Sequence, residues 1–210
     1  MMRLYMLLVG FLLVSCTDYE SIIDNDYDEL ESLLRTVSTG SMGDARNGKI
    51  YKTVKIGNQT WMAENLNYEM SDMHCYESNA DNCIKYGRLY TWTAALLACP
   101  SGWHLPTNAE WETLIMAVGG ESRAGTRLKS NTGWNDNGNG TDAFYFSARP
   151  AGAMTLAGFD TGEGNNAFFW SSTEYDKNSA YLMHLRYDHP AASFGSNTKN
   201  NGYSVRCLKD

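Results

Sequence analysis

The chain has 210 residues, with 24 acidic against 17 basic side chains and a formal net charge of −7. The basic residues form no visible cluster, so nucleic acid is not an expected partner. The length and a hydrophobic content of 43% suit one globular domain of ordinary size.

Residues 4–14 form an apolar run near the N-terminus. This run is too short to cross a bilayer, which takes about 20 residues, but it suits the apolar region of a secretory signal. Leu13, Ser15 and Cys16 follow the pattern of a bacterial lipobox. We therefore expect removal of residues 1–15 and lipidation of Cys16, which would anchor the protein to the outer membrane, outside the cytoplasm. An ordinary signal peptide or an uncleaved anchor is the alternative.

The segment after Cys16 is acidic and then small and polar. Such a composition buries too little apolar surface to order itself. We expect residues 16–47 to be a flexible tether and residues 48–210 to be the globular domain. The acidic side chains at the start of the tether are Asp18, Glu20, Asp24, Asp26, Asp28, Glu29 and Glu31.

Export would place the remaining four cysteines in an oxidising compartment, where disulfides persist. Four cysteines allow three pairings. Cys75 and Cys83 share a short polar stretch that could close on itself, which leaves Cys99 to pair with Cys207. A zinc site at Cys75 and Cys83 is the alternative, although their spacing is not that of a zinc finger.

Periodicity predicts the first elements of the domain. Alternation from Lys49 predicts a strand, and the segment TWMAEN after a GNQ turn predicts its hairpin partner. A helix is predicted from Trp92 to Cys99, with Trp92, Ala95, Leu96 and Cys99 on its buried side. Alternation around Cys207 predicts that this cysteine faces inward from a strand.

A second helix is predicted after a capping box formed by Thr107 and Glu110. Its buried residues are expected to be Trp111, Leu114, Ile115 and Val118, and Gly119–Gly120 should end it. Short strands separated by long loops are expected at about 144–148, 168–172, 180–187 and 203–208. Two helices followed by long-looped antiparallel strands predict an α+β fold.

Several sequence words occur in a fixed order along residues 44–210: NGKIYKTVKIGNQTWMAENLNY, KYGRLYTW, ACPSGWHLPTNAEWETL, FWSSTE and YSVRCLKD. In this order they closely resemble the Fibrobacter succinogenes major paralogous domain family. One departure is Arg149, which stands where the family usually has Leu.

That family is similar to C-type-lectin-like domains and to the formylglycine-generating enzymes. The resemblance implies a C-type-lectin-like fold with a disulfide from the first helix to the last strand. It also implies that the N- and C-terminal strands pair and that a long loop region carries the binding surface.

The loop from Thr132 to Asp142 holds the candidate ligand site. Its triplet of Trp134, Asn135 and Asp136 occurs in C-type lectins near calcium and sugar, and oxygens of Asp136, Asn139 and Asp142 could bind calcium. Calcium is the one cofactor we consider. The alternative is ordinary turn chemistry, with the Trp134 indole anchored in the core.

Six tryptophans are distributed through the chain. We expect Trp92, Trp103 and Trp111 in the core and Trp61 and Trp170 to be half-buried. Trp134, within a polar loop, is the best placed to offer an exposed face to a sugar.

These expectations lead to a non-catalytic surface lipoprotein that serves as a binding or adhesion module, with polysaccharide as its ligand. One alternative is an envelope lipoprotein that binds another protein or has a structural role. Another is an enzyme of the formylglycine-generating type, which would need two nearby free cysteines late in the chain. Cys207 is the one late cysteine and is expected in a disulfide, while His104 is expected to bond locally.

Overall fold

The computed structural model describes residues 29–155 and 157–210. The chain divides into two compact units, Met1–Ser32 and Leu33–Asp210, and every element named below belongs to the second. The predicted signal peptide and Cys16 lie outside the described residues. Within the described ranges, the helices are all too short or too polar to cross a membrane.

The first sheet has five strands in the order β1-β2-β3-β12-β6, all antiparallel. Its strands are β1 (Ser38–Gly43), β2 (Ile50–Ile56), β3 (Gln59–Met62), β6 (Trp103–His104) and β12 (Leu208–Lys209). The predicted hairpin of β2 and β3 is confirmed, and β12 enters between β3 and β6. The end of the chain thus closes the sheet that its first strands begin.

The predicted extent of the tether is wrong at its C-terminal end. Residues 38–43 form β1, which pairs in continuous register with β2. The segment STGSMG is polar and exposed, so no apolar alternation marks it as a strand. Main-chain hydrogen bonds to β2 order it instead, and the domain begins well before residue 48.

The second sheet has the order β11-β10-β9-β7-β8 and is antiparallel except between β7 and β9. Its strands are β7 (Ala151–Thr155), β8 (Gly158–Glu163), β9 (Asn166–Glu174), β10 (Ser179–Arg186) and β11 (Ala192–Thr198). A further pair joins β4 (Met73–His74) to β5 (Leu89–Tyr90). The expected strands near 168–172 and 180–187 are present, whereas residues 144–148 are irregular apart from a bridge at Ala148.

Both predicted helices are present, as α3 (Trp92–Ala98) and α4 (Asn108–Ala117). Thr107 and Glu110 form the predicted capping box of α4, and its predicted apolar side chains are buried. Helices α2 (Ala80–Tyr86) and α5 (Glu121–Leu128) and the short 3-10 turn η1 (Tyr76–Ser78) were not predicted.

The predicted buried side of α3 is wrong at Leu96, which is 40% exposed. The helix packs through Ala94, Ala95 and Ala98 instead. Small side chains allow the helix backbone to approach the core closely, which turns Leu96 toward solvent.

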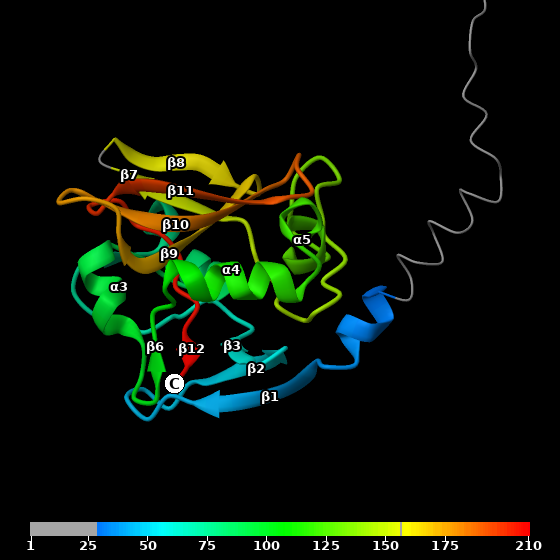
Figure 1. The fold of residues 1–210 in the computed structure, drawn as a ribbon. Helices are drawn as coiled ribbons and strands as arrows, with labels where there is room; N and C mark the ends of the chain where they lie inside the picture. Colours follow the sequence, from blue (N-terminus) through cyan, green and yellow to red (C-terminus); the bar gives the residue numbers. More distant parts are fainter. Residues whose placement is uncertain (1–28, 156) are drawn as a thin grey trace, which may run out of the picture. The chain divides into compact units, whose positions relative to one another are not determined.

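Helix α4 lies between the two five-stranded sheets (Figure 1), and Trp111 of this helix contacts both of them. Its ring centroid is 4.6 Å from that of Trp61 on β3 and 5.7 Å from that of Phe169 on β9. Trp61 and Trp170, expected to be half-buried, are fully buried, whereas Trp92 and Trp103 are only partly buried. The core is therefore an aromatic cluster shared by both sheets.

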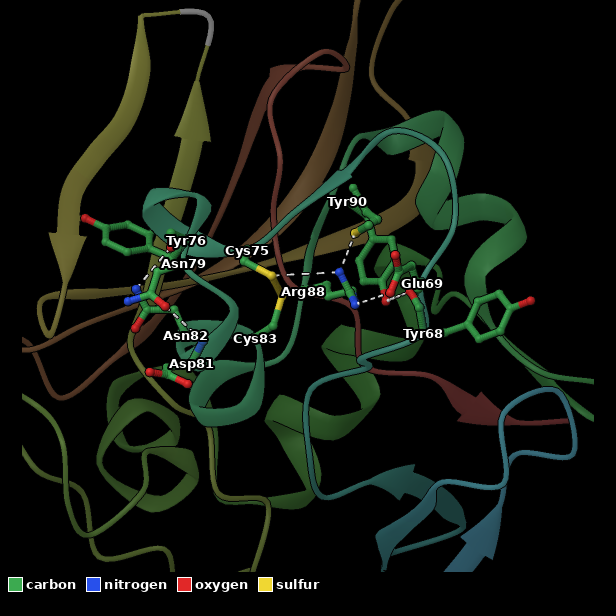
Figure 2. The surroundings of a disulfide bond; sticks show 11 residues. Tyr68, Glu69, Cys75, Tyr76, Asn79, Asp81, Asn82, Cys83, Arg88 and Tyr90 are labelled. Carbon is green, nitrogen blue, oxygen red and sulfur yellow. Dashed lines mark hydrogen bonds and ion pairs between the residues drawn. A yellow bond between two sulfur atoms is a disulfide. The ribbon is translucent and has the colours of Figure 1, made fainter.

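Two disulfides fix the fold, and they join the expected partners. Cys99 at the end of α3 bonds to Cys207, which directly precedes β12. Cys75 bonds to Cys83 across η1 and the start of α2. Figure 2 shows Arg88 beside this second disulfide, where it forms an ion pair with Glu69 at 2.8 Å and donates to the sulfur of Met73 at 3.0 Å. The protein is thus an α+β fold with mostly antiparallel sheets and two disulfides.

Candidate functional site

The loop from Thr132 to Asp142 does not present Trp134 to solvent. The Trp134 side chain is 5% exposed, and its indole N–H donates to Ser130 Oγ at 3.1 Å and to the Ala148 carbonyl at 3.2 Å. The ammonium of Lys129 lies 5.1 Å from the ring centroid. The prediction of an exposed stacking face at Trp134 is therefore wrong. The ring is buried, and its N–H bonds to acceptors inside the domain, so the side chain anchors the loop in the core.

The polar residues of this loop largely bond to its own neighbourhood. Asn139 Oδ1 accepts from the main-chain N–H of Trp134 at 3.0 Å, and the Asn135 amide donates to Asn165 Oδ1 at 3.0 Å. The Asp142 carboxylate accepts from the N–H and the hydroxyl of Ser147 at 2.7 and 2.5 Å. These contacts fit the turn-chemistry alternative.

Calcium binding by Asp136, Asn139 and Asp142 stays a prediction. Asp136 is exposed, whereas oxygens of the other two already accept hydrogen bonds from the protein. Within residues 29–155 and 157–210, no group of three or more His, Cys, Asp or Glu side chains is arranged to hold a metal ion.

A shallow hollow of about 280 Å³ lies where this loop meets the turn between β10 and β11. Lys129 holds the two together, because its buried ammonium donates to the carbonyls of Arg186, Tyr187 and His189 at 3.0 to 3.3 Å. Burial lowers the pKa of Lys129. Gly138 packs so closely that a Cβ there would lie 2.4 Å from the Tyr187 carbonyl oxygen. All three donors of the ammonium serve the fold.

A deeper hollow of about 450 Å³ lies between β1, β2 and the segment that follows Asp142. We call it the Tyr145 groove, and it is lined by Thr39, Gly40, Lys52, Thr53, Ala63, Tyr145 and Ser147. Tyr145 is 58% exposed, and within the described residues Tyr175 is the one other aromatic side chain among the exposed large hydrophobic residues. The groove therefore combines an accessible aromatic ring with hydroxyl groups and one ammonium.

The backbone beneath the groove is held in an uncommon conformation. Asp142, Tyr145 and Ser147 have φ values of 50°, 55° and 52°, in the left-handed region that non-glycine residues rarely adopt. Each such residue costs of order 1–3 kcal/mol and persists only where its surroundings impose it. Asp142 imposes part of this geometry through its two hydrogen bonds to Ser147.

Arg206 imposes the rest from inside the core. This fully buried guanidinium donates to the main-chain carbonyls of Phe146 and Ser147, at 2.5 and 2.8 Å. It also donates to Asn65 Oδ1 at 2.6 Å and to the Met62 carbonyl at 3.1 Å. Burial lowers the pKa of Arg206 to about 9. A buried cation thus sets the path of the segment that carries Tyr145.

Sequence reasoning missed Tyr145 as a site residue, although a signal was present. Phe144, Phe146 and Ala148 are all buried, and the residues between them, Tyr145 and Ser147, face outward. Alternation alone therefore indicated an outward-facing aromatic ring at Tyr145.

Candidate catalytic side chains are engaged within the fold. His104 Nδ1 lies 2.7 Å from Asp210 Oδ1, and its Nε2 lies 3.0 Å from Glu110 Oε1. Burial works against its protonation, but the two carboxylates outweigh burial and raise the pKa of His104. The other carboxylate oxygen of Glu110 caps α4 by accepting from Thr107. His104 therefore ties β6 to Asp210 and to the start of α4.

Residues 54–209 match the family model of the Fibrobacter succinogenes major domain. No curated protein and no solved structure matches the chain. The matched stretch runs from β2 to β12 and includes Tyr145, Arg206 and both disulfides. The chain therefore belongs to the Fibrobacter succinogenes major domain family.

Proposed function

We propose that the protein is a non-catalytic lipoprotein, anchored through Cys16 at the cell surface, whose domain binds polysaccharide in the Tyr145 groove. The observation that carries this proposal is the exposed ring of Tyr145 at the edge of a hollow of about 450 Å³. Binding pockets for small molecules usually measure about 300–1,000 Å³.

The chemistry of the lining suits a sugar ring. A sugar has an apolar C–H face and a rim of hydroxyl groups, so it packs on an aromatic ring while its rim forms hydrogen bonds. Thr39, Thr53 and Ser147 line the groove. A threonine hydroxyl can both donate and accept a hydrogen bond, whereas the Ser147 hydroxyl donates to Asp142 and keeps its acceptor capacity. Lys52 adds donors at the same place.

The constrained backbone supports a binding role. Ligand binding is weakened by the cost of ordering the groups that make contact. Here Arg206 and Asp142 already hold the main chain of Phe146 and Ser147, directly after Tyr145. Left-handed residues at such a position are common at ligand sites, where the strain orients a side chain.

The proposal includes a C-type-lectin-like fold for the domain. The disulfide from α3 to the segment before β12 and the pairing of β12 with β3 both agree with that fold. The groove is formed in part by the irregular segment between α5 and β7, which corresponds to the long loop region expected to carry the binding surface.

A protein partner in the envelope is the second candidate. Leu96 and Leu97 are exposed side by side on α3, and Leu97 is 72% exposed. Adjacent exposed leucines are typical of a contact surface when they belong to a larger apolar patch.

The test is a binding assay of the purified full-length protein against a panel of insoluble polysaccharides. We expect Tyr145→Ala to weaken binding by about 5- to 150-fold, by analogy with the 1–3 kcal/mol of base–aromatic stacking. Tyr175→Ala is the matched control, because Tyr175 is 55% exposed between β9 and β10, does not line the groove, and should leave binding unchanged when replaced. Equal binding by the parent and Tyr145→Ala, or no binding by the parent, would reject the proposal.

A further inference from the structure

A group of basic side chains lies next to the Tyr145 groove. Two smaller hollows, of about 30 and 120 Å³, share Lys85, Tyr86 and Arg149 in their walls. Lys49 and Glu64 line the smaller of the two, and Thr132 and Gly133 line the larger. We call this pair of hollows the Arg149 site.

The Arg149 site continues the Tyr145 groove along the same chain segments. Lys52 and Ala63 line the groove, whereas Lys49 and Glu64 line the adjoining site. The third segment runs from Tyr145 and Ser147 in the groove to Arg149 in the site. Because the lining residues are separated by only one to three positions along these segments, the two hollows lie within reach of a polymer longer than one sugar unit.

The charge of the Arg149 site is opposite to that of the whole protein. Three cations, Lys49, Lys85 and Arg149, line it together with one carboxylate, Glu64. Glu163 contacts Lys85 at 3.3 Å, so three cations minus two carboxylates still leave a balance of +1. The chain as a whole carries −7.

Contacts within the protein orient these cations, and they engage one oxygen of the Glu64 carboxylate. Arg149 is exposed, and one of its terminal nitrogens donates to the Lys85 carbonyl at 2.6 Å, which fixes the guanidinium at the wall. Glu64 Oε2 accepts from the main-chain N–H of Lys52 at 2.7 Å. The ammonium of Lys49 lies 4.8 Å from the Tyr51 ring centroid and is half-buried.

We propose that the polysaccharide taken up by the Tyr145 groove is a polyuronate, with a carboxylate bound at the Arg149 site by Arg149 and Lys49. This inference rests on the proposed function and names its ligand class. A guanidinium matches a planar carboxylate with two parallel N–H donors, and such charge-assisted hydrogen bonds are about twice as strong as neutral ones. A sugar on Tyr145 and a carboxylate on the adjoining residue of the polymer would use both parts of the surface.

The test compares two forms of one polymer, polygalacturonate and its fully methyl-esterified derivative, which lacks the charge. Binding of the full-length protein is measured by affinity electrophoresis at low and high salt. We expect the parent to bind polygalacturonate about 10- to 100-fold more tightly than the ester and to lose this preference as salt screens the charges.

Substitutions separate this inference from the proposed function. Arg149→Leu should bind polygalacturonate no better than the ester, and Arg149→Lys should retain part of the preference. Tyr145→Ala should bind both polymers about 5- to 150-fold more weakly. Lys177→Leu, which removes an exposed cation elsewhere, is the matched control. A thermal melt of each variant checks that the fold is intact.

Three outcomes would overturn the inference. They are an Arg149→Leu variant that binds polygalacturonate as the parent does, a parent without preference for the charged polymer, and a parent that binds dextran sulfate but not polygalacturonate. If the parent binds the neutral ester through Tyr145 alone, the proposed function stands and the polyuronate assignment fails. If the parent binds no polysaccharide, both fail.

Discussion

The left-handed backbone at Tyr145 makes a prediction about stability that is independent of any ligand. Tyr145→Ala and Tyr145→Gly both remove the ring, so the two variants differ only in how well the residue tolerates a φ of 55°. The left-handed conformation costs a residue with a Cβ about 1–2 kcal/mol, whereas glycine loses about 0.5–1 kcal/mol of extra backbone entropy. The balance predicts that Tyr145→Gly is more stable than Tyr145→Ala by about 1 kcal/mol.

Tyr175 provides the control for this comparison. It is exposed to a similar extent and is absent from the residues with positive φ. At such a position the order of the two variants reverses, because the entropy cost of glycine is not offset by relief of strain. Tyr175→Ala should therefore be more stable than Tyr175→Gly.

Thermal unfolding of the four variants decides the matter. One kcal/mol corresponds to about 2–4 °C for a domain of 150–250 residues, which includes the compact unit Leu33–Asp210. A Tyr145→Gly variant that melts below Tyr145→Ala would refute the claim that the fold imposes strain here. Both variants should lose polysaccharide binding, so at this position the more stable protein would also be inactive.

Three other predictions concern the core, acid stability and the anchor. Trp134→Ala should lower the free energy of unfolding by about 3–5 kcal/mol, as for a core tryptophan, and urea unfolding with an unchanged midpoint would contradict the burial of its indole. Burial lowers the pKa of His184 to about 4. Its contribution to stability should therefore be complete above the unfolded pKa of about 6.5 and fall as the pH drops toward 4. Denaturant titrations should show a smaller loss of stability in acid for His184→Gln than for the parent, and equal losses would exclude His184 as the cause. Cys16→Ala should move the protein from the membrane fraction to the soluble or unprocessed fraction, and detergent partitioning like that of the parent would reject lipidation of Cys16.

The best-predicted parts of the fold are those whose signals are local. The capping box of Thr107 and Glu110 and the apolar spacing of Trp111, Leu114 and Ile115 define α4 because side chains within the helix satisfy its ends and mark its buried side. The disulfide pairing could be predicted because Cys75 and Cys83 are close enough in the sequence to bond to each other. Cys99 and Cys207 then remained as the second pair.

The parts that were missed depend on contacts between distant segments. Helix α5 contains glycine, serine and threonine, and it is ordered by packing, with Gly125 so close to Pro190 and Ala191 that a Cβ would lie 2.5 Å from a carbonyl oxygen. Strand β1 has no apolar pattern and depends on the edge of β2.

The candidate site was misplaced for a similar reason. The polar loop around Trp134 suggested exposure, but its indole reaches Ala148 across the fold. The Tyr145 groove is formed by β1, β2 and a distant turn, and Arg206, more than 50 residues further along the chain, sets the conformation of that turn. Local sequence patterns do not contain these relationships.

The position of Arg206 and Cys207 also determines when the domain can fold. Residues 201–208 are all buried, and they pair with Trp61, Tyr90 and Phe168, which lie far earlier in the chain. A chain that crosses a membrane with its N-terminus first delivers these residues last, so the first sheet lacks β12 and the Tyr145 turn lacks Arg206 until residue 208 has emerged. Contacts of such long sequence separation also fold slowly. If the chain is exported as we propose, the first sheet and the Tyr145 groove would therefore be completed only after the whole segment has crossed.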